Sequence, residues 1–375
     1  MTRDIARWVW CVVVLAAAGC PVSPDGDARV NPFTDLPPVA MNGRPVALEN
    51  DIAVLGTLQA GDVVRLRVDG DGVQRVLILT DDETSDATGV MVGGGPGNAG
   101  FQFRAARTAR HFVFVQSEPS ADRIRATLSA EAGDPSYMPP SSQRVVVRFD
   151  DGFLSEPGLF DPTTGTDDQR AFLDSISDPV REQIVERLRD IFDGTPIQIL
   201  EDGDDPAEPF SVVTISPERV TADSGELAAD AIQPPDTSRP ECLDVVVFGE
   251  VLPSGSGLDP GNQVLNDEAV VYVGSFQGRG ETCQTAAINS VNNIVLGISQ
   301  TAAHEIGHLV GLHHSALIGI MDRSVSLAFQ RELDFDRAQI LTERRAEGDA
   351  STVVTTVVTS VVQDPFVYFD SIFAR

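Results

Sequence analysis

The feature that most constrains this chain is a dense group of histidines near residue 310. The sequence has five histidines in 375 residues, and four of them lie in the stretch TAAHEIGHLVGLHHS at 301–315: His304, His308, His313 and His314. So many titratable rings in so short a segment need a structure that gives them partners.

His304 and His308 are four residues apart, so in a helix over 299–310 they lie on one face, about 6 Å apart along the axis. Gly311 has no Cβ and can adopt the positive φ that ends a helix and turns the chain back. This turn brings His314 round to the other two rings. We therefore predict that three imidazoles meet at one point.

Three neutral imidazoles that leave one coordination position open are typical of a catalytic Zn²⁺ site, whereas structural zinc sites have four protein ligands. Glu305 follows the first ligand and can reach a water bound there, accept its proton and pass it to a departing amine. This chemistry is amide hydrolysis without a covalent intermediate. The other interpretation is an amphipathic helix with solvated histidines.

The stretch HEIGHLVGLHH fits the pattern HExxHxxGxxH and resembles the metzincin zinc metallopeptidases. Met321, in GIMD, is similar in position to the Met-turn of that family. The resemblance implies an α+β, zincin-like domain with a mixed sheet and an active-site helix. It also implies that His304, His308 and His314 bind Zn²⁺ and that Glu305 is the general base.

Within that clan the layout resembles the matrixins, because Ser315 follows the third ligand and an apolar-acidic segment, ELDFDRAQIL, follows Met321 as an expected helix. Asp322 stands where matrixins favour an aromatic residue, and no tyrosine follows nearby as an extra ligand. The N-terminal module has no cysteine, so the cysteine-switch latency of matrix metalloproteases is absent. We expect His313 to lie beside the metal site or to be exposed.

The first residues, MTRDIARWVWCVVVLAAAGC, have arginines before an apolar run that is too short to span a bilayer. Residues 1–19 resemble a lipoprotein signal peptide, which implies a lipid anchor on Cys20. Ordinary cleavage and secretion is the alternative. Pro21 after the cysteine favours an outer-membrane or cell-surface location. Residues 20–45, rich in Pro, Asp, Gly and Asn, predict a flexible linker.

Two further cysteines, Cys242 and Cys283, would then lie in an oxidising compartment. We predict a disulfide between them, and the alternative is a pair of buried free thiols.

Short alternating apolar runs separated by turn residues predict a small all-β sandwich over 46–131. Its layout resembles the pre-peptidase C-terminal accessory domain of secreted bacterial proteases. A linker at 132–143 leads to the catalytic domain at 144–348, in which strands and helices alternate and Asp178 and Pro179 begin a helix. The stretch AVVYVGSF at 269–276 is an expected edge strand that could pair with substrate, and the alternative is a simple core strand. Residues 349–375 form a C-terminal segment without an assigned role.

The formal net charge of −29 excludes nucleic acid as a partner, because phosphate would be repelled. The expected substrates are proteins or peptides outside the cytoplasm. One rival function is a surface adhesion or binding lipoprotein whose zinc site is structural or vestigial, and another is hydrolysis of a non-peptide amide or ester. The acidic run EDGDD at 201–205 could hold Ca²⁺, although a solvated loop is the simpler reading.

Overall fold

The structure is a computed structural model that describes fifteen segments of the chain. These are residues 37–48, 52–71, 73–81, 89–117, 126–154, 167–204, 206–218, 220–221, 246–247, 249–252, 258–276, 290–315, 319–322, 332–346 and 349–374. The described residues belong to one compact unit, Leu36–Arg375. The leader, Cys20, Cys242 and Cys283 lie outside the described residues, so the lipid anchor and the disulfide stay predictions.

Two sheets built largely from the N-terminal part share one apolar core. Their strand orders are β1-β8-β3-β6 and β16-β17-β5-β4-β7-β2. Leu66, Ile78, Val113 and Leu128 are fully buried between them, because alternate side chains of each strand point to the same face. The N-terminal strands are β1 (Val46–Ala47), β2 (Ile52–Leu58), β3 (Val63–Gly70), β4 (Val73–Thr80), β5 (Gly89–Pro96), β6 (Gly100–Arg104), β7 (Ala109–Ser117) and β8 (Ala126–Ala132).

Strand β5 is an element that the sequence pattern does not predict. Its sequence, GVMVGGGP, is rich in glycine, which is depleted in strands. It pairs antiparallel with β4 and parallel with β17 (Asp349–Gln363). A Cβ on Gly94 would lie 2.6 Å from both Pro260 Cβ and Val76 O, so the glycine allows the loop at Pro260 to contact the sheet directly.

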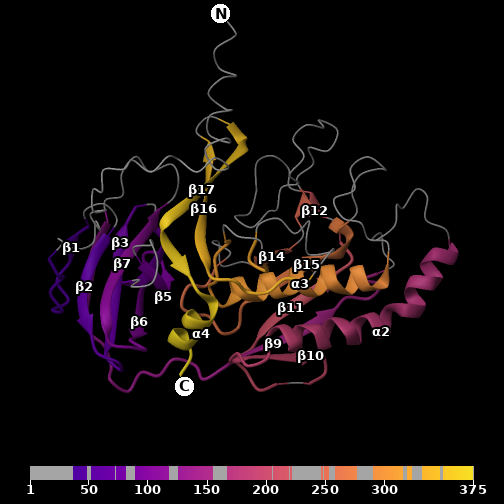
Figure 1. Cartoon of the computed structure of the whole chain (residues 1–375), viewed down its shortest axis with the longest axis horizontal. Helices are drawn as coiled ribbons and strands as arrows, with labels where there is room; N and C mark the ends of the chain where they lie inside the picture. The colour runs from indigo at the N-terminus through magenta and orange to yellow at the C-terminus, as the bar shows by residue number, and fades with distance from the viewer. Residues whose placement is uncertain are drawn as a thin grey trace, which may run out of the picture. The chain divides into compact units, whose positions relative to one another are not determined.

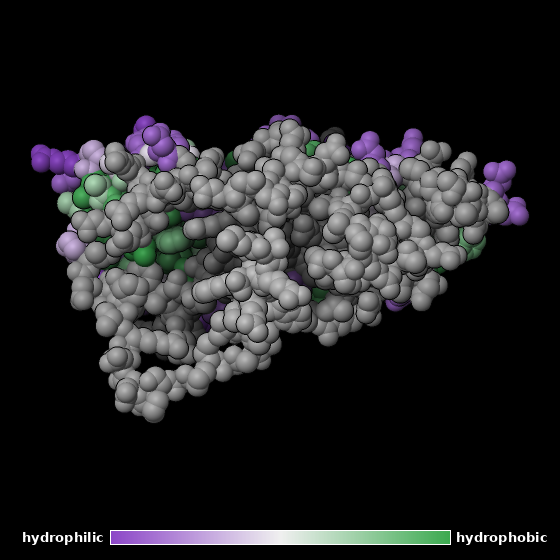
Figure 2. Space-filling view, turned by 90° about the horizontal axis from the view of Figure 1, so that it is seen from above, coloured by the Kyte–Doolittle hydropathy of each residue, from purple (hydrophilic) through white to green (hydrophobic). Residues whose placement is uncertain are grey.

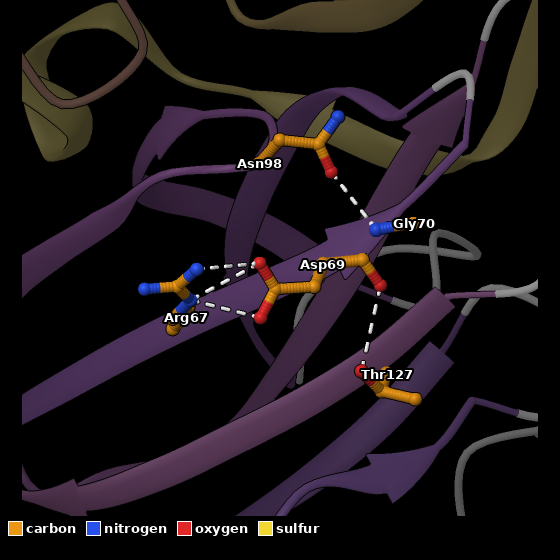
Figure 3. A network of polar contacts seen from close by, with 5 residues as sticks. All are labelled: Arg67, Asp69, Gly70, Asn98 and Thr127. Atoms are coloured by element: carbon orange, nitrogen blue, oxygen red, sulfur yellow. Dashed lines mark hydrogen bonds and ion pairs between the residues drawn. The ribbon is translucent and has the colours of Figure 1, made fainter.

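Polar contacts join strands β3 and β8 and the turn between β5 and β6 at the exposed side of the four-stranded sheet. Figure 3 shows Arg67 donating to the carboxylate of Asp69, with Nε–Oδ2 at 2.8 Å. The backbone N–H of Gly70 donates to Asn98 Oδ1 at 2.9 Å, and Thr127 Oγ1 donates to the Asp69 carbonyl at 3.5 Å. Figure 2 shows hydrophilic side chains at both ends of the view, in each case with hydrophobic side chains close by.

The second half of the chain forms a mixed five-stranded sheet of order β10-β9-β11-β15-β14. Its strands are β9 (Gln143–Phe149), β10 (Ile197–Glu201), β11 (Ser211–Ser216), β14 (Gly249–Leu252) and β15 (Glu268–Tyr272). The first four positions in this order pair in parallel, and β14 pairs antiparallel with β15. A short pair, β12 (Val220–Thr221) and β13 (Val246–Val247), and a 3₁₀ turn, η2 (Val273–Phe276), accompany it.

Two helices pack on this sheet and on each other. Figure 1 shows α3 (Val291–Leu309) beside β15 and β11, with α2 (Asp167–Ile191) alongside. The protein is therefore a mixed α+β structure, as the order of elements in the sequence predicts. No helix in the described part of the chain is both long and apolar enough to cross a membrane.

Three local predictions are wrong. Helix α2 runs unbroken from Asp167 with Pro179 inside it, because Val180, Ile184 and Leu188 bury its apolar face and outweigh the lost hydrogen bond. Strand β15 is a core strand, the alternative to the expected edge strand, because β14 covers its outer side, and the last four residues expected in the strand form η2 instead. The stretch ELDFDRAQIL at 332–341, expected as a helix, instead leads into a strand, β16 (Ala338–Ala346), because β17 offers it a pairing partner.

The C-terminal segment completes the fold. Strand β17 joins the six-stranded sheet, and α4 (Pro365–Ile372) follows it, capped by the side chain of Asp364. Phe369 contacts Phe335, which contacts Phe192 at the end of α2. These aromatic contacts fix the C-terminal helix against the helix-containing half of the protein.

Candidate metal centre

Helix α3 is the scaffold of the site. Ser290 caps its first turn by accepting from Asn293 N, and the helix begins at Val291, earlier than the predicted start at 299. Every residue from Ile294 to Leu309 is buried. A helix buried on all sides is rigidly held, so the side chains at 304, 305 and 308 have defined positions.

The helix ends in a Schellman motif. Leu312 N donates to Gly307 O at 2.7 Å, and Gly311 N donates to His308 O at 2.9 Å. Gly311 has a φ of +91°, the conformation that this motif requires and that other residues adopt only with strain. The turn directs the chain back along the helix, so that His314 returns to the face that carries His304 and His308.

The three histidine rings converge through their Nε2 atoms. The Nε2–Nε2 distances are 3.0 Å between His304 and His308, 3.1 Å between His304 and His314, and 3.3 Å between His308 and His314. All three side chains are buried, and within the described residues they are the group that could hold a metal ion.

The tautomers of two rings follow from their other nitrogens. His304 Nδ1 lies 2.6 Å from Ile320 O, and His308 Nδ1 lies 2.7 Å from Leu312 O. A carbonyl only accepts, so each Nδ1 carries the proton and each Nε2 presents a lone pair. Two facing lone pairs cannot share a hydrogen bond, and a cation between them resolves this arrangement.

Burial keeps these rings uncharged. It lowers the pKa of His304 to about 3, with His314 adding to the effect, and it lowers the pKa of His308 well below the usual value. Both imidazoles are therefore neutral at pH 7, which is the form that binds metals.

The dimensions also suit a zinc-sized ion. Zn–N bonds of about 2.0–2.1 Å in a tetrahedral site separate the nitrogens by roughly 3.3–3.4 Å. The observed separations of 3.0–3.3 Å are close to this value. Carbonyls that orient the outer ring nitrogens are the usual second layer of such a site.

Glu305 lies on the same helix, fully buried, next to the first histidine. Its carboxylate faces β14, because a Cβ added to Gly249 would lie 2.4 Å from Glu305 Oε1. Gly249 therefore leaves room for the Glu305 carboxylate against β14. No spacing in the sequence relates position 249 to position 305.

Met321 lies beneath the helix, where its Sδ would be 2.5 Å from a Cβ at Gly307. Its carbonyl accepts from Ser315 N at 2.8 Å, and the preceding Ile320 carbonyl contacts His304. The segment 320–321 thus supports the first ligand and the residue after the third. The sequence predicted a turn here but not these partners.

His313 is buried and is not one of the three converging rings. Its backbone N–H donates to Gln363 Oε1 at 2.8 Å. Burial, together with Arg75 and His314, lowers the pKa of its ring well below the usual value. Of the two positions expected for it, the structure shows the one beside the site.

Tyr272 is a residue near the site that the sequence pattern missed. Its hydroxyl donates to Glu250 Oε1 on the neighbouring strand. Burial makes the largest contribution to the raised pKa of Tyr272, the hydrogen bond to Glu250 makes the next largest, and the charge of Glu305 also contributes. The end of β15 therefore lies within electrostatic reach of Glu305.

The acidic run at 201–205 begins at the end of β10, and its described residues, 201–204, are largely exposed. Glu201 pairs with Arg189 at 3.2 Å and Asp202 with Arg148 at 3.5 Å, while Asp204 accepts from the backbone of Glu201. Arginine and backbone partners at these carboxylates fit a solvated turn.

Comparisons with known proteins assign no family. No protein-family model matches the chain, and no curated protein matches it. Solved structures show only faint likeness. Salicylyl-acyltransferase SsfX3 from a tetracycline biosynthetic pathway is 10% identical over 45% of this chain and 63% of its own, with a TM-score of 0.14.

Two esterases give similar values. A family two carbohydrate esterase from Cellvibrio japonicus is 12% identical over 46% of this chain and 66% of its own, with a TM-score of 0.13. The acetyl xylan esterase Est2A from Butyrivibrio proteoclasticus is also 12% identical, over 43% and 49%, with a TM-score of 0.13. The chain thus spans less than two thirds of the length of these structures. At such scores the likeness carries no argument about fold or function.

Proposed function

We propose that this protein is a zinc-dependent endopeptidase of the metzincin type that acts on proteins or peptides outside the cytoplasm. The observation that carries the proposal is the convergence of the Nε2 atoms of three buried histidines, two of which come from a helix that also holds the buried Glu305. A ligand set of imidazole nitrogens alone favours zinc and its neighbours over Ca²⁺ or Mg²⁺.

The bound ion would lower the pKa of a water molecule and polarise the substrate carbonyl. The chain's own residues would do the rest. Glu305 accepts the proton of the attacking water and delivers it to the leaving amine, while Ile320 and Leu312 keep His304 and His308 in the orientation that binds the metal.

The position of strand β14 favours the hypothesis that the substrate is a peptide rather than another amide. It is the outermost strand on its side of the described sheet, antiparallel to β15, and its Gly249 lies against Glu305. An outer strand presents backbone groups with which an extended peptide can pair, and this pairing would bring the scissile bond to Glu305. The lipid anchor on Cys20 belongs to the same proposal and would hold the enzyme at a membrane surface.

The test compares hydrolysis of casein and of a peptide library by the wild type, the chelator-treated protein and Glu305→Gln. We expect cleavage by the wild type alone, and equal metal content in the wild type and Glu305→Gln by mass spectrometry. A wild type that binds zinc but cleaves no peptide would favour the rival reading as a binding protein. Cleavage of esters or small amides alone, seen by product analysis, would favour the other rival function, hydrolysis of a non-peptide amide or ester.

A further inference from the structure

The third metal ligand, His314, does not lie on the helix. His304 and His308 are fixed by α3, but His314 follows the turn at Gly311, so its position depends on what holds that turn. We infer that Gln363, at the end of β17, is a positioning residue that holds this turn and so sets the place of the third ligand. The inference rests on the proposed function only in taking the three histidines as metal ligands.

Gln363 binds the turn with both ends of its side-chain amide. Its Oε1 accepts from His313 N at 2.8 Å, and its Nε2 donates to Gly311 O at 3.3 Å. The side chain is buried, as are His313 and His314. A buried backbone N–H or C=O group without a hydrogen-bond partner makes the folded state less stable. These two bonds therefore favour one conformation of residues 311–313.

Gln363 is itself held from two sides. It pairs with Ala338 of β16, while the neighbouring Val362 pairs with Val90 of β5. Its Nε2 also lies 3.4 Å from Met91 Sδ. The amide that orients the ligand turn is thus anchored in the sheet that contains the N-terminal strands.

The opposite side of the turn is held by the loop before β15. Asp259 N donates to His308 O at 3.3 Å, and Gly261 N donates to the Tyr368 hydroxyl at 2.6 Å. A Cβ at Gly311 would lie 2.3 Å from that hydroxyl and 2.5 Å from Asp259 O. The turn therefore lies between this loop and Gln363, with little room to shift.

The consequence is specific to metal binding. Residues that orient metal ligands typically alter metal affinity by about 10- to 100-fold when they are replaced. Loss of Gln363 should release His314 while His304 and His308, which are held by the helix, stay in place. The site should then bind metal more weakly and with altered geometry.

The experiment titrates the metal-free full-length protein with Zn²⁺ and with Co²⁺, whose visible spectrum reports coordination geometry. We expect Gln363→Met, which keeps the volume but removes both hydrogen bonds, to bind at least about tenfold more weakly and to change the Co²⁺ spectrum. Gln363→Glu keeps an acceptor for His313 N–H and should lose less affinity.

The control is Gln102→Met. Gln102 is a half-buried glutamine of β6 whose Oε1 accepts from Asp134 N at 2.9 Å, away from the ligand turn and from the loop before β15. It should lower the unfolding temperature and leave metal affinity within about twofold of the wild type, below the range expected for a ligand-orienting residue.

Wild-type affinity and an unchanged Co²⁺ spectrum in a folded Gln363→Met would overturn the inference. Circular dichroism establishes folding, and if that variant does not fold, Gln363→Glu decides by the same criterion. A wild type that binds no metal also overturns it. Normal metal binding by a wild type that hydrolyses nothing would instead sink the proposed function and leave the role of Gln363 intact.

Discussion

At the scale of single residues, the candidate site depends on two glycines as much as on its three histidines. Gly249 of β14 lies against the carboxylate of Glu305, and Gly307 of α3 lies against the sulfur of Met321. Each glycine lets a functional side chain occupy space that a Cβ would fill. The atoms displaced by a substitution would be the ends of those side chains rather than backbone.

Gly249→Ala tests this at Glu305, the proposed general base. The new methyl group would overlap Glu305 Oε1, and the flexible end of Glu305 would move away from the metal. We expect kcat/KM to fall by about 10²-fold, because a displacement of about 1 Å can have that effect. Metal affinity should stay within about twofold, since no ligand-orienting group is changed.

The control for this variant is Gly100→Ala, where the nearest atom to a Cβ is Leu66 O at 3.6 Å. It should leave both activity and metal binding unchanged. Full activity in Gly249→Ala would mean that Glu305 does not need its present position.

At the scale of elements, α2 shows how tertiary packing overrides a local stop signal. Pro179 cannot donate to the carbonyl one turn earlier, yet the helix continues because its apolar face is buried. Helix and strand types followed the periodicity of apolar residues, whereas β5 and β16 depended on pairing partners far away in the chain.

Pro179→Ala should therefore stabilise the protein. Pro179 is exposed, and alanine would restore a backbone hydrogen bond without filling any space. We expect the free energy of unfolding to rise by about 1–3 kcal/mol in urea titrations, within the helix-propensity difference between the two residues. Asp178→Ala, at the exposed neighbour, should change it by less than about 0.5 kcal/mol. Destabilisation by Pro179→Ala would show that the proline is needed for the helix path.

The loop before β15 contains two buried carboxyl groups that predict a pH dependence. Burial raises the pKa of Asp259 to about 7, and burial with the nearby Asp259 charge raises that of Asp267 to about 7. Their usual value is 3.8, so the folded state binds more protons between about pH 4 and 7. Their contribution to stability is present at low pH and is lost as the pH rises through this window.

Asp267→Asn should remove part of the stability loss that occurs as the pH rises. The amide oxygen can still accept from Ser211 Oγ, which now donates to Asp267. We expect the variant to be more stable than the wild type at pH 8 by about 1–3 kcal/mol, with the difference vanishing near pH 4. Urea unfolding at the two pH values measures it, with the exposed Asp193→Asn as control. A wild type that is the more stable one at pH 8 would contradict the prediction.

At the scale of the whole molecule, the candidate metal centre joins parts of the chain that are distant in sequence. The helix at 291–309, the segment at 320–321, the loop at 259–261 and the C-terminal residue Gln363 all contact the ligands or the turn that carries one of them. An ion that binds only this assembly should stabilise the compact unit as a whole.

Metal removal should accordingly lower the unfolding temperature of the entire protein. An ion present at a hundred times its Kd adds about 2.7 kcal/mol to the free energy of unfolding. We expect chelation to lower the unfolding temperature by several degrees and added Zn²⁺ to restore it. His314→Ala should abolish this response, whereas His111→Asn should retain it, because His111 lies in β7 with Nδ1 against Ala109 O. Equal unfolding temperatures with and without metal would contradict the prediction.

The parts of the site that the sequence could predict are those set by local geometry. Four residues between His304 and His308 place both rings on one helix face, and a glycine at 311 permits the turn that returns His314. The α+β class and most strands followed from the spacing of apolar residues for the same reason. Each of these depends on neighbours within a few residues.

Only the tertiary structure could decide which distant groups complete the site. The carbonyls of Ile320 and Leu312 fix two tautomers, Gly249 makes room for Glu305, and Gln363 holds the ligand turn from a strand of another sheet. No periodicity relates such positions, because their proximity arises from the pairing of strands and the packing of a helix across long stretches of chain. The convergence of the three histidine rings could therefore be predicted from the sequence, and the contacts that keep them in place could not.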